Sequence, residues 1–305
     1  MNEAKYIWMN GKVIDWKDAT THVLSHTLHY GNGVIEGTKA YKTDDGYAIF
    51  RLNDHTKRLK ESAKMTLIDI PYTIEELNEA QLDLLRKNEF KGDNVYIRPF
   101  AFLGYGVMGV YHVDAPIETV IAAWEWGAYL GEDGLKNGIK LKIASMTRAA
   151  NTSNMGKAKA TANYLNSQMA KFEAIDCGYD EALLLDDQGY VAEASGACFF
   201  MVKDGVLISP PNDNSLESIT QKTVIEIAQD MGYEVVRRKI TREELYVADE
   251  AFLTGTAAEI TPVRNIDARV IGEGRCGEIT EVIQKTYFDI VFGRNEKYKH
   301  YLTYI

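Results

Sequence analysis

The hydrophobic and polar positions along the chain follow two periods, one typical of strands and one typical of helices. Residues 94–103, NVYIRPFAFL, alternate with period 2, so Tyr96 and Arg98 are expected on the same face of a strand. Asn10-Gly11 separates two short strand patterns and is a strong hairpin signal. Other strands are predicted at residues 6–9, 12–14, 47–52, 117–126, 139–144, 181–185, 190–194, 198–202, 206–209 and 251–253.

Capping residues mark the helices predicted between these strands. Thr73 and Glu76 form the sequence pattern of a capping box, which predicts a helix over residues 74–87. Asn53 is a good N-cap for an earlier helix, whose second turn contains Arg58. A last helix is expected at about 278–292. Strands and helices therefore both contribute to the predicted fold.

Two segments of the second half are suited to binding an anion through the backbone. Ser218 and Gln221 fit a capping box for a helix over residues 219–231, closed by Gly232. The start of that helix would offer backbone N–H groups and the positive end of the helix dipole. The small residues GTAA, 255–258, are suited to a backbone nest. An unliganded capped helix is the commoner case, so neither segment defines a site by itself.

Lys159 stands at the head of a helical pattern. Leu165, Met169 and Phe172 recur in that pattern at i, i+4 and i+7, so one apolar face is expected to pack on the core. Since lysine is almost never buried without a partner, a solvated lysine at a helix start is the ordinary interpretation. Its neighbours are, however, small enough for a flat ring to lie close to the backbone: Ala158, Ala160, Thr161 and Ala162.

Composition and charge argue against several classes of function. The 305 residues carry a formal net charge of −10, which disfavours a nucleic-acid or anionic-membrane surface. No window approaches the roughly 18 apolar residues of a membrane span, and the N-terminal residues lack an apolar signal region. Cys177, Cys198 and Cys276 have no metal-ligand spacing, so no metal is predicted and a reducing cytoplasm is expected. The length suggests two domains.

Three sequence motifs resemble those of a known enzyme family and occur in the same order along the chain. The run KAKATANYL around Lys159 resembles the segment of the fold-type IV pyridoxal 5′-phosphate (PLP) transaminases that holds the cofactor-binding lysine, followed by an Asn-Tyr pair. AEASGACFF (192–200) and FLTGTAAEITPVRNID (252–267) match later motifs of that family. With the YIRP sequence of the strand 94–103, the chain resembles the branched-chain amino acid aminotransferase group from about Tyr6 to its C-terminus.

The resemblance implies a mixed α+β and α/β fold of fold-type IV, similar to D-amino acid aminotransferase, with two domains and the cofactor site between them. We expect a small N-terminal α/β domain at 1–127, an interdomain loop at 128–136 and a large C-terminal PLP-binding domain at 137–305. The segment GYGVMGV, 104–110, matches a loop that reaches the neighbouring subunit's pocket in the family. The implied assembly is a homodimer or a hexamer built as a trimer of dimers.

The resemblance also assigns the polar groups of PLP to residues of this chain. Lys159 is the implied catalytic residue, which binds the cofactor covalently and moves the substrate's α-proton as acid and base. Glu193 is expected to pair with the ring nitrogen, and Tyr164 to form a hydrogen bond with the ring's 3′ oxygen. The cofactor's phosphate is assigned to Arg58, Ser218, Ile219, Thr220 and Thr256.

The implied reaction is the reversible transfer of an amino group from leucine, isoleucine or valine to 2-oxoglutarate, giving the branched 2-oxo acid and glutamate. One pocket must accept both an apolar side chain and glutamate's distal carboxylate, for which Arg98 is the natural partner. Tyr96 and the backbone of Thr256-Ala257 are expected to hold the α-carboxylate. The other implied substrate-binding residues are Tyr30, Ile35, Gly37, Val110, Trp126 and Tyr129.

Other activities are compatible with the same residues. A D-amino acid or (R)-amine transaminase would share Lys159 and Glu193, although Tyr96 and Arg98 together favour the branched-chain group. A PLP-dependent aminodeoxychorismate lyase would release pyruvate instead of exchanging an amino group. A binding protein descended from the fold could keep the pocket without turnover, but an intact lysine, acid and phosphate set argues against it.

Overall fold

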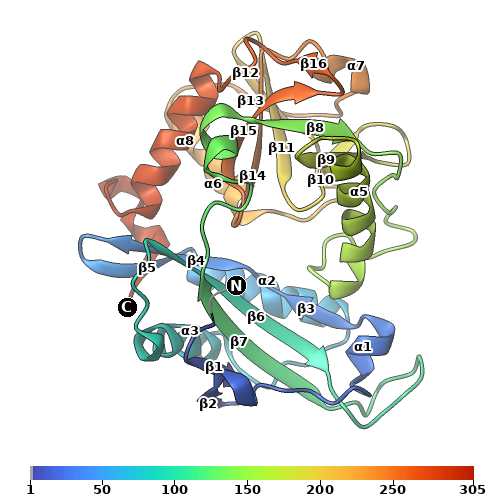
Figure 1. Ribbon diagram of the computed structural model, residues 1–305, viewed down its shortest axis with the longest axis vertical. Helices are drawn as coiled ribbons and strands as arrows, with labels where there is room; N and C mark the ends of the chain where they lie inside the picture. Colours follow the sequence, from blue (N-terminus) through green and yellow to red (C-terminus); the bar gives the residue numbers. More distant parts are fainter. Residues whose placement is uncertain (1–2) are drawn as a thin grey trace. The chain divides into compact units, whose positions relative to one another are not determined.

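The computed structural model describes residues 3–305, and the chain divides into two compact units (Figure 1). The first unit extends to Trp126 and also contains Ala158–Ala162 and Val291–Ile305. The second unit comprises Gly127–Lys157 and Asn163–Ile290. The chain therefore returns to the first unit twice, once with the short segment that contains Lys159 and once with its C-terminal residues.

An eight-stranded sheet is the centre of the described part of the first unit, with strand order β17-β5-β4-β6-β7-β1-β2 and β3 paired to β6. Helix α3 packs against α2 and on strands β1 and β7 of this sheet. The elements are β1 (Tyr6–Met9), β2 (Lys12–Asp15), η1 (Trp16–Asp18), α1 (His26–Tyr30), β3 (Gly33–Ile35), β4 (Thr38–Thr43), β5 (Gly46–Phe50), α2 (Leu52–Met65), α3 (Ile74–Asn88), β6 (Asn94–Leu103), β7 (Ile117–Glu125), η3 (Glu296–Tyr301) and β17 (Leu302–Tyr304).

Local sequence rules set several of these elements as predicted. Asn10 and Gly11 have φ angles of 50° and 86°, the left-handed pair that a two-residue hairpin turn requires. Thr73 and Glu76 form both hydrogen bonds of the capping box that opens α3. Strand β6 covers the predicted residues 94–103. The hairpin, the capping box and this central strand are thus confirmed.

The predicted start of α2 at Asn53 is wrong. The helix begins at Leu52 with Arg51 as its N-cap, in a left-handed conformation with φ 51°. The backbone N–H of Arg51 donates to the carbonyl of Tyr301 at 2.7 Å, and its guanidinium lies 4.2 Å from the centre of the Tyr301 ring. A contact with the C-terminal segment, invisible to local capping rules, therefore sets where the helix begins.

A nine-stranded sheet is the centre of the described part of the second unit, with strand order β10-β9-β8-β15-β14-β11-β12-β13 and β16 paired to β15. Most pairs are antiparallel, while β8 runs parallel to β9 and β15, and β12 runs parallel to β13. Beyond η2 (Thr161–Asn163), where the chain enters this unit, the elements are α4 (Glu132–Asn137), β8 (Ile139–Ile143), α5 (Tyr164–Asp176), β9 (Glu181–Leu185), β10 (Val191–Ala194), β11 (Cys198–Lys203), β12 (Val206–Ser209), α6 (Ile219–Asp230), β13 (Val235–Arg237), α7 (Arg242–Leu245), β14 (Glu250–Gly255), β15 (Glu259–Ile266), β16 (Arg269–Val270) and α8 (Glu278–Val291).

Helix α5 buries a different face from the predicted one. Leu165, Met169 and Phe172 are 65%, 41% and 60% exposed, so the expectation that they pack on the core is wrong. The buried face consists instead of small residues, and Ala170 and Ala174 pack in a cluster with residues of β9. Short side chains let the helix approach the sheet closely, and the larger apolar residues then point outward. An apolar stripe on this helix is therefore left on the surface of the described structure.

Of the two hydrogen bonds of the capping box predicted for helix α6, one is present. The hydroxyl of Ser218 accepts a hydrogen bond from the backbone N–H of Gln221 at 3.2 Å. The predicted reciprocal bond of the capping box is wrong, because the Gln221 amide donates to Ser209 at 2.9 Å and accepts from Asn212. Gly232 follows the helix with φ 83°, the left-handed conformation of a closing glycine.

Among residues 3–305, no helix combines the length and apolar character that crossing a bilayer demands.

Candidate active site

Lys159 is held by backbone contacts within the first unit. Its backbone N–H donates to the hydroxyl of Ser62 on α2 at 3.0 Å, and its carbonyl accepts from the N–H of Ile35 at the end of β3, also at 3.0 Å. Ala158 and Ala160, on either side of it, are buried in the hydrophobic core of this unit. The small neighbours noticed in the sequence thus let the segment enter the core, while the Lys159 residue is only half-buried.

A buried carboxylate lies beside this segment in the first unit. Glu36 is fully buried and accepts from Arg58 through two nitrogens, Nε at 2.6 Å and Nη2 at 2.9 Å. His55 contributes its Nδ1 at 2.8 Å from Oε2, and the N–H of Gly37 lies 3.2 Å from the same oxygen. Glu36 therefore joins the turn after β3 to helix α2, which carries both His55 and Arg58.

The charges of this cluster compensate one another. Burial by itself would raise the pKa of Glu36, but the charge of Arg58 and the hydrogen bond from His55 outweigh it and hold that pKa well below its usual range. Burial lowers the pKa of His55, with Arg58 and Lys159 acting in the same direction and Glu36 acting against them. At neutral pH the cluster thus contains one carboxylate, one guanidinium and a neutral imidazole.

Tyr96 and Arg98 meet on one face of β6, as the alternation predicted. Arg98 Nη2 donates to the Tyr96 hydroxyl at 3.0 Å, whereas Arg98 Nε is buried and has no hydrogen-bond partner in residues 3–305. Gly37 faces the same hydroxyl so closely that a Cβ at this position would come within 2.0 Å of it. The Trp126 ring packs edge-on against Tyr96 with centroids 4.9 Å apart. Four residues assigned to substrate binding therefore form one group in the first unit.

Tyr30 and Val110 lie at another place in the first unit. The hydroxyl of Tyr30 accepts from the N–H of Gly109 at 3.1 Å, and the carbonyl of Gly109 lies 2.7 Å from Nε2 of His26. Val110, the next residue, is 86% exposed. The structure thus ties the loop before Val110 to helix α1 and presents Val110 on the surface of this subunit.

In the second unit, Glu193 lies on β10 as a buried carboxylate. Arg148 Nε is 2.8 Å from Glu193 Oε1, and Arg148 Nη1 donates to the hydroxyl of Ser167 at 3.1 Å. Tyr164 is the first residue of α5, the helix that also carries Ser167. Arg148 therefore connects the strand of Glu193 to helix α5.

The two predicted anion-binding segments both lie in the second unit. At the start of α6, the first N–H groups, those of Ile219 and Thr220, have no intrahelical acceptor by helix geometry. The side chain of Ser218 already accepts from Gln221. Residues 256–258 form the turn between β14 and β15, and the Thr261 hydroxyl holds this turn by donating to the Ala258 carbonyl at 2.7 Å. Each segment presents backbone donors of the kind that bind phosphate.

Tyr129 lies in the predicted interdomain loop, just before α4. The residue is 40% exposed, and the ammonium of Lys171 on α5 is 5.9 Å from the centre of its ring. Lys171 also pairs with the buried carboxylate of Glu181 at 2.9 Å. Tyr129 thus belongs to the second unit, whereas Tyr96, Arg98 and Trp126 belong to the first.

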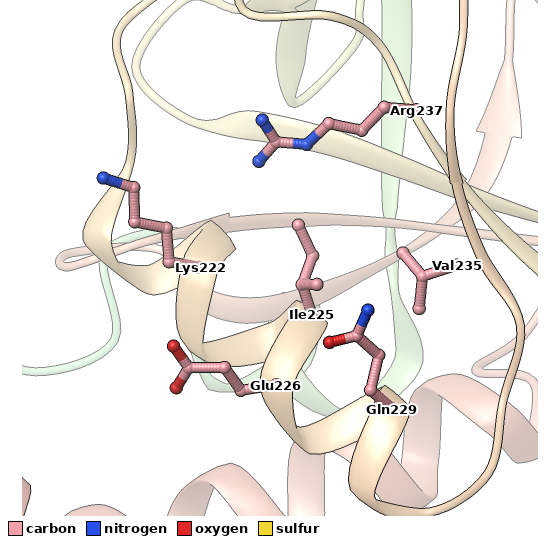
Figure 2. Close-up of a pocket in the computed structure, with 6 residues that line it drawn as sticks. All are labelled: Lys222, Ile225, Glu226, Gln229, Val235 and Arg237. Carbon is pink, nitrogen blue, oxygen red and sulfur yellow. The ribbon is translucent and has the colours of Figure 1, made fainter.

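A depression between α6 and β13 contains none of the predicted site residues. Figure 2 shows its lining side chains on α6 and β13, and its volume is about 490 Å³. The lining mixes charged, polar and apolar groups: Lys222, Ile225, Glu226, Gln229, Val235 and Arg237. It is therefore no candidate for the chemistry assigned to Lys159.

Sequence reasoning missed His55 and Arg148, which complete the two buried ion clusters. His55 precedes Arg58 by three residues on α2, a spacing that places both on one helix face, so helical periodicity could have found it. Arg148 lies in an irregular segment after β8, and no local pattern relates it to Glu193. Its role follows only from the folded arrangement.

Comparison with known proteins gives these residues a family context. Residues 33–266 match the family described as class IV amino-transferases. The branched-chain-amino-acid aminotransferase of Pseudomonas aeruginosa is 48% identical over 299 residues, which cover 98% of this chain and 97% of that protein.

Two solved structures of a branched-chain amino acid aminotransferase from the organism abbreviated T.th. are also similar. The one with pyridoxamine 5′-phosphate superimposes with a TM-score of 0.95 at 47% identity. The one complexed with N-(5′-phosphopyridoxyl)-L-glutamate has a TM-score of 0.94 at 46% identity. In both cases the match covers 100% of this chain and 99% of the other. The family match and the relative together show that the chain belongs to the class IV aminotransferases, the fold-type IV family of PLP enzymes.

Proposed function

We propose that this protein is a PLP-dependent branched-chain-amino-acid aminotransferase. It transfers the amino group of leucine, isoleucine or valine to 2-oxoglutarate, giving the branched 2-oxo acid and glutamate, and the reaction is reversible. The observation that carries the proposal is that the first unit contains both the Lys159 segment, held against Ser62, and the Tyr96–Arg98 pair of β6, on a chain whose near full-length relatives have this activity in their names. The same transfer serves as the last step of branched-chain amino acid synthesis or the first step of breakdown.

The donors and acceptors of the chain fit PLP. A phosphate requires several N–H or O–H donors, and we assign it to the first N–H groups of α6, the turn at 256–258 and the side chains of Thr256 and Arg58. Glu193 supplies a carboxylate for a protonated ring nitrogen, and Tyr164 a phenol for the ring's 3′ oxygen. When bound, PLP supplies the electron sink that stabilises negative charge at the substrate's α-carbon.

The protein's own part in the reaction is to hold the reactants and move a proton. The Lys159 amine would hold the cofactor covalently, and as base and acid it would take the proton from the substrate's α-carbon and return one. Glu193 keeps the ring nitrogen protonated, because a carboxylate next to that nitrogen favours its charged form. Arg148 in turn orients Glu193 through its Nε.

Substrate recognition has two parts. Tyr96 and the backbone of Thr256-Ala257 hold the α-carboxylate that all substrates share. Arg98 meets the distal carboxylate of glutamate or 2-oxoglutarate. Its Nε supports this role, because it is buried with no hydrogen-bond partner among residues 3–305, and such buried donors are rare in folded proteins. Apolar side chains contact Ile35, Trp126 and Tyr164, while Gly37 leaves room beside the Tyr96 hydroxyl.

We also propose that the protein is at least a homodimer, with a trimer of dimers as the larger form. The exposed apolar residues Leu165, Met169 and Phe172 on α5 and Val110 in the 104–113 loop support this, since such surfaces mark interfaces in soluble proteins. In the dimer, Val110 and Tyr30 would complete the partner's substrate pocket. Sedimentation velocity at micromolar concentration would contradict this assembly by showing a monomer.

Within residues 3–305 the cysteines form no disulfide, which is typical of the cytoplasm that we propose as the location of the protein.

A panel of amino donors with 2-oxoglutarate tests the activity. The purified protein should show a visible absorption band that L-leucine, L-isoleucine and L-valine bleach, with glutamate as the product. Bleaching by D-leucine but not by L-leucine would instead indicate a D-amino acid transaminase, and pyruvate release would indicate a lyase.

Lys159→Ala should remove the covalent cofactor link and all transamination, because the lysine amine is the group that reacts. Borohydride reduction followed by peptide mapping checks the link. Lys157→Ala is the matched control, since Lys157 is 51% exposed at its side chain and pairs with Glu217 on the surface. Label on Lys157 and none on Lys159 would overturn the assignment.

A further inference from the structure

Glu36 is a buried carboxylate that accepts four hydrogen bonds, and it follows Ile35, whose N–H binds the Lys159 carbonyl. Its side chain has no exposed surface, and it accepts from Arg58, His55 and the N–H of Gly37. The contact with Arg58 is a fork of two N–H groups onto two oxygens, which fixes the plane of the guanidinium as well as its distance. Glu36 therefore restricts the orientation of Arg58 through two bonds.

The same carboxylate links three residues assigned to the site. Arg58 is the assigned phosphate ligand, and Gly37 faces the Tyr96 hydroxyl. Ile35, one residue before Glu36, donates its N–H to the Lys159 carbonyl. Displacement of Glu36 would therefore disturb Arg58 directly and the backbone on both sides of it.

The charge of the cluster explains why a carboxylate is needed here. Arg58 is only 12% exposed at its side chain, and a buried guanidinium without a counter-charge is costly. Glu36 supplies that counter-charge, while burial lowers the pKa of His55 so that the imidazole adds none.

We propose that Glu36 is a positioning residue, which aims Arg58 at the cofactor's phosphate and, through His55, holds helix α2 against the turn after β3. This inference rests on the proposed function, because it takes PLP as the ligand. Glu36 does not touch the reacting atoms. Its effect is exerted on phosphate binding and passes through Arg58.

The test compares cofactors with and without a phosphate. Glu36→Gln keeps the shape of the side chain and one acceptor but removes the charge. The full-length holoenzyme of this variant should release PLP about tenfold or more faster than wild type, as expected when a charge-assisted pair is lost. After reconstitution, the affinity for pyridoxal, which lacks the phosphate, should change by less than about twofold, because no Arg58 contact is at stake. Equal losses for PLP and pyridoxal would show a merely structural role and overturn the proposal.

A double variant separates action through Arg58 from a general effect. If Glu36 works through Arg58, then Glu36→Gln/Arg58→Gln should release PLP at the rate of Arg58→Gln alone, since the oriented group is already gone. The double variant also removes both buried charges together, so it stays informative if Glu36→Gln by itself fails to fold. A clear additional loss in the double variant would contradict the proposal.

Glu181→Gln is the matched control in the second unit. Glu181 is equally buried and pairs with Lys171 at 2.9 Å. Its substitution should lower thermal stability without changing the ratio of PLP to pyridoxal affinity, and a shift of that ratio as large as in Glu36→Gln would overturn the proposal. A wild-type protein that binds no PLP would refute the proposed function itself, which is a different outcome.

Discussion

Two buried glutamate–arginine pairs lie in the two units, and they differ in geometry. In the first unit, Arg58 directs two nitrogens to Glu36, which also accepts from His55. In the second unit, Arg148 meets Glu193 through Nε and directs Nη1 to Ser167 instead. Glu36 has no exposed side-chain surface, whereas that of Glu193 is 10% exposed.

The difference indicates different tasks for the same pair of residue types. A forked and fully buried carboxylate fixes its arginine and has little capacity to bind a ligand itself. The carboxylate of Glu193 is oriented by Arg148 and keeps a small exposed surface, 10% of its side chain, at which a ring N–H could approach. We infer that the first pair serves binding and the second pair serves chemistry.

The sharpest test of this division is Glu193→Gln. The amide can still accept from Arg148, so PLP should remain bound, but it cannot keep the ring nitrogen protonated. The half-reaction should slow by about 100-fold or more, the scale of positioned acid–base effects. Stopped-flow absorbance in single turnover measures it.

Glu36→Gln is the counterpart, because it should lose PLP faster and yet keep its half-reaction within about threefold of wild type when saturated with cofactor. If Glu193→Gln kept the wild-type single-turnover rate, Glu193 would not be the ring's partner and the comparison would fail.

Arg98 extends the comparison to an arginine whose Nε has no hydrogen-bond partner within residues 3–305. If it awaits a substrate carboxylate, Arg98→Leu should weaken the glutamate half-reaction by about 2 to 5 kcal/mol, the range for truncating one partner of a buried charge pair. The leucine half-reaction should suffer much less, since that side chain carries no charge. Separate stopped-flow measurements of the two half-reactions check this, and equal losses in both would defeat the dual role of Arg98.

The smallest expected effect is the pH dependence of stability from the His55–Glu36 pair. The folded pKa of His55 is lowered mainly by burial, so below about pH 6.5 the unfolded chain binds the proton better and stability falls with falling pH. Glu36, whose pKa is also lowered in the fold, adds to the loss below about pH 4.3. One such group contributes at most about 1.4 kcal/mol per pH unit.

His55→Gln should therefore flatten the fall between about pH 6.5 and 5 when unfolding by urea is followed at several pH values. His300→Gln, at an exposed histidine, is the matched control for the loss of an imidazole. An unchanged slope in His55→Gln would mean that His55 titrates alike in the folded and unfolded states.

The sequence alone determined the features that depend on neighbours in the chain. Asn10-Gly11 fixed a hairpin because both residues accept left-handed backbone, and Thr73 with Glu76 fixed the start of α3 through bonds made within one turn. The alternation of β6 placed Tyr96 and Arg98 together for the same local reason. The motif around Lys159 indicated the family, and the family match agrees with it.

Tertiary structure decided the features in which distant segments compete for one position. Helix α5 buries alanines rather than its larger apolar residues, since the distance to the sheet, and not helical periodicity, selects the inward face. Helix α2 begins at Leu52, because its N-cap Arg51 is bound by the carbonyl of Tyr301 in the C-terminal segment. The bond between Arg148 and Glu193 joins residues 45 positions apart, and that between Glu36 and Arg58 joins residues 22 apart. Propensity and periodicity act over a few residues, whereas the pairing of buried charges depends on which distant residues the folded chain brings within hydrogen-bonding distance.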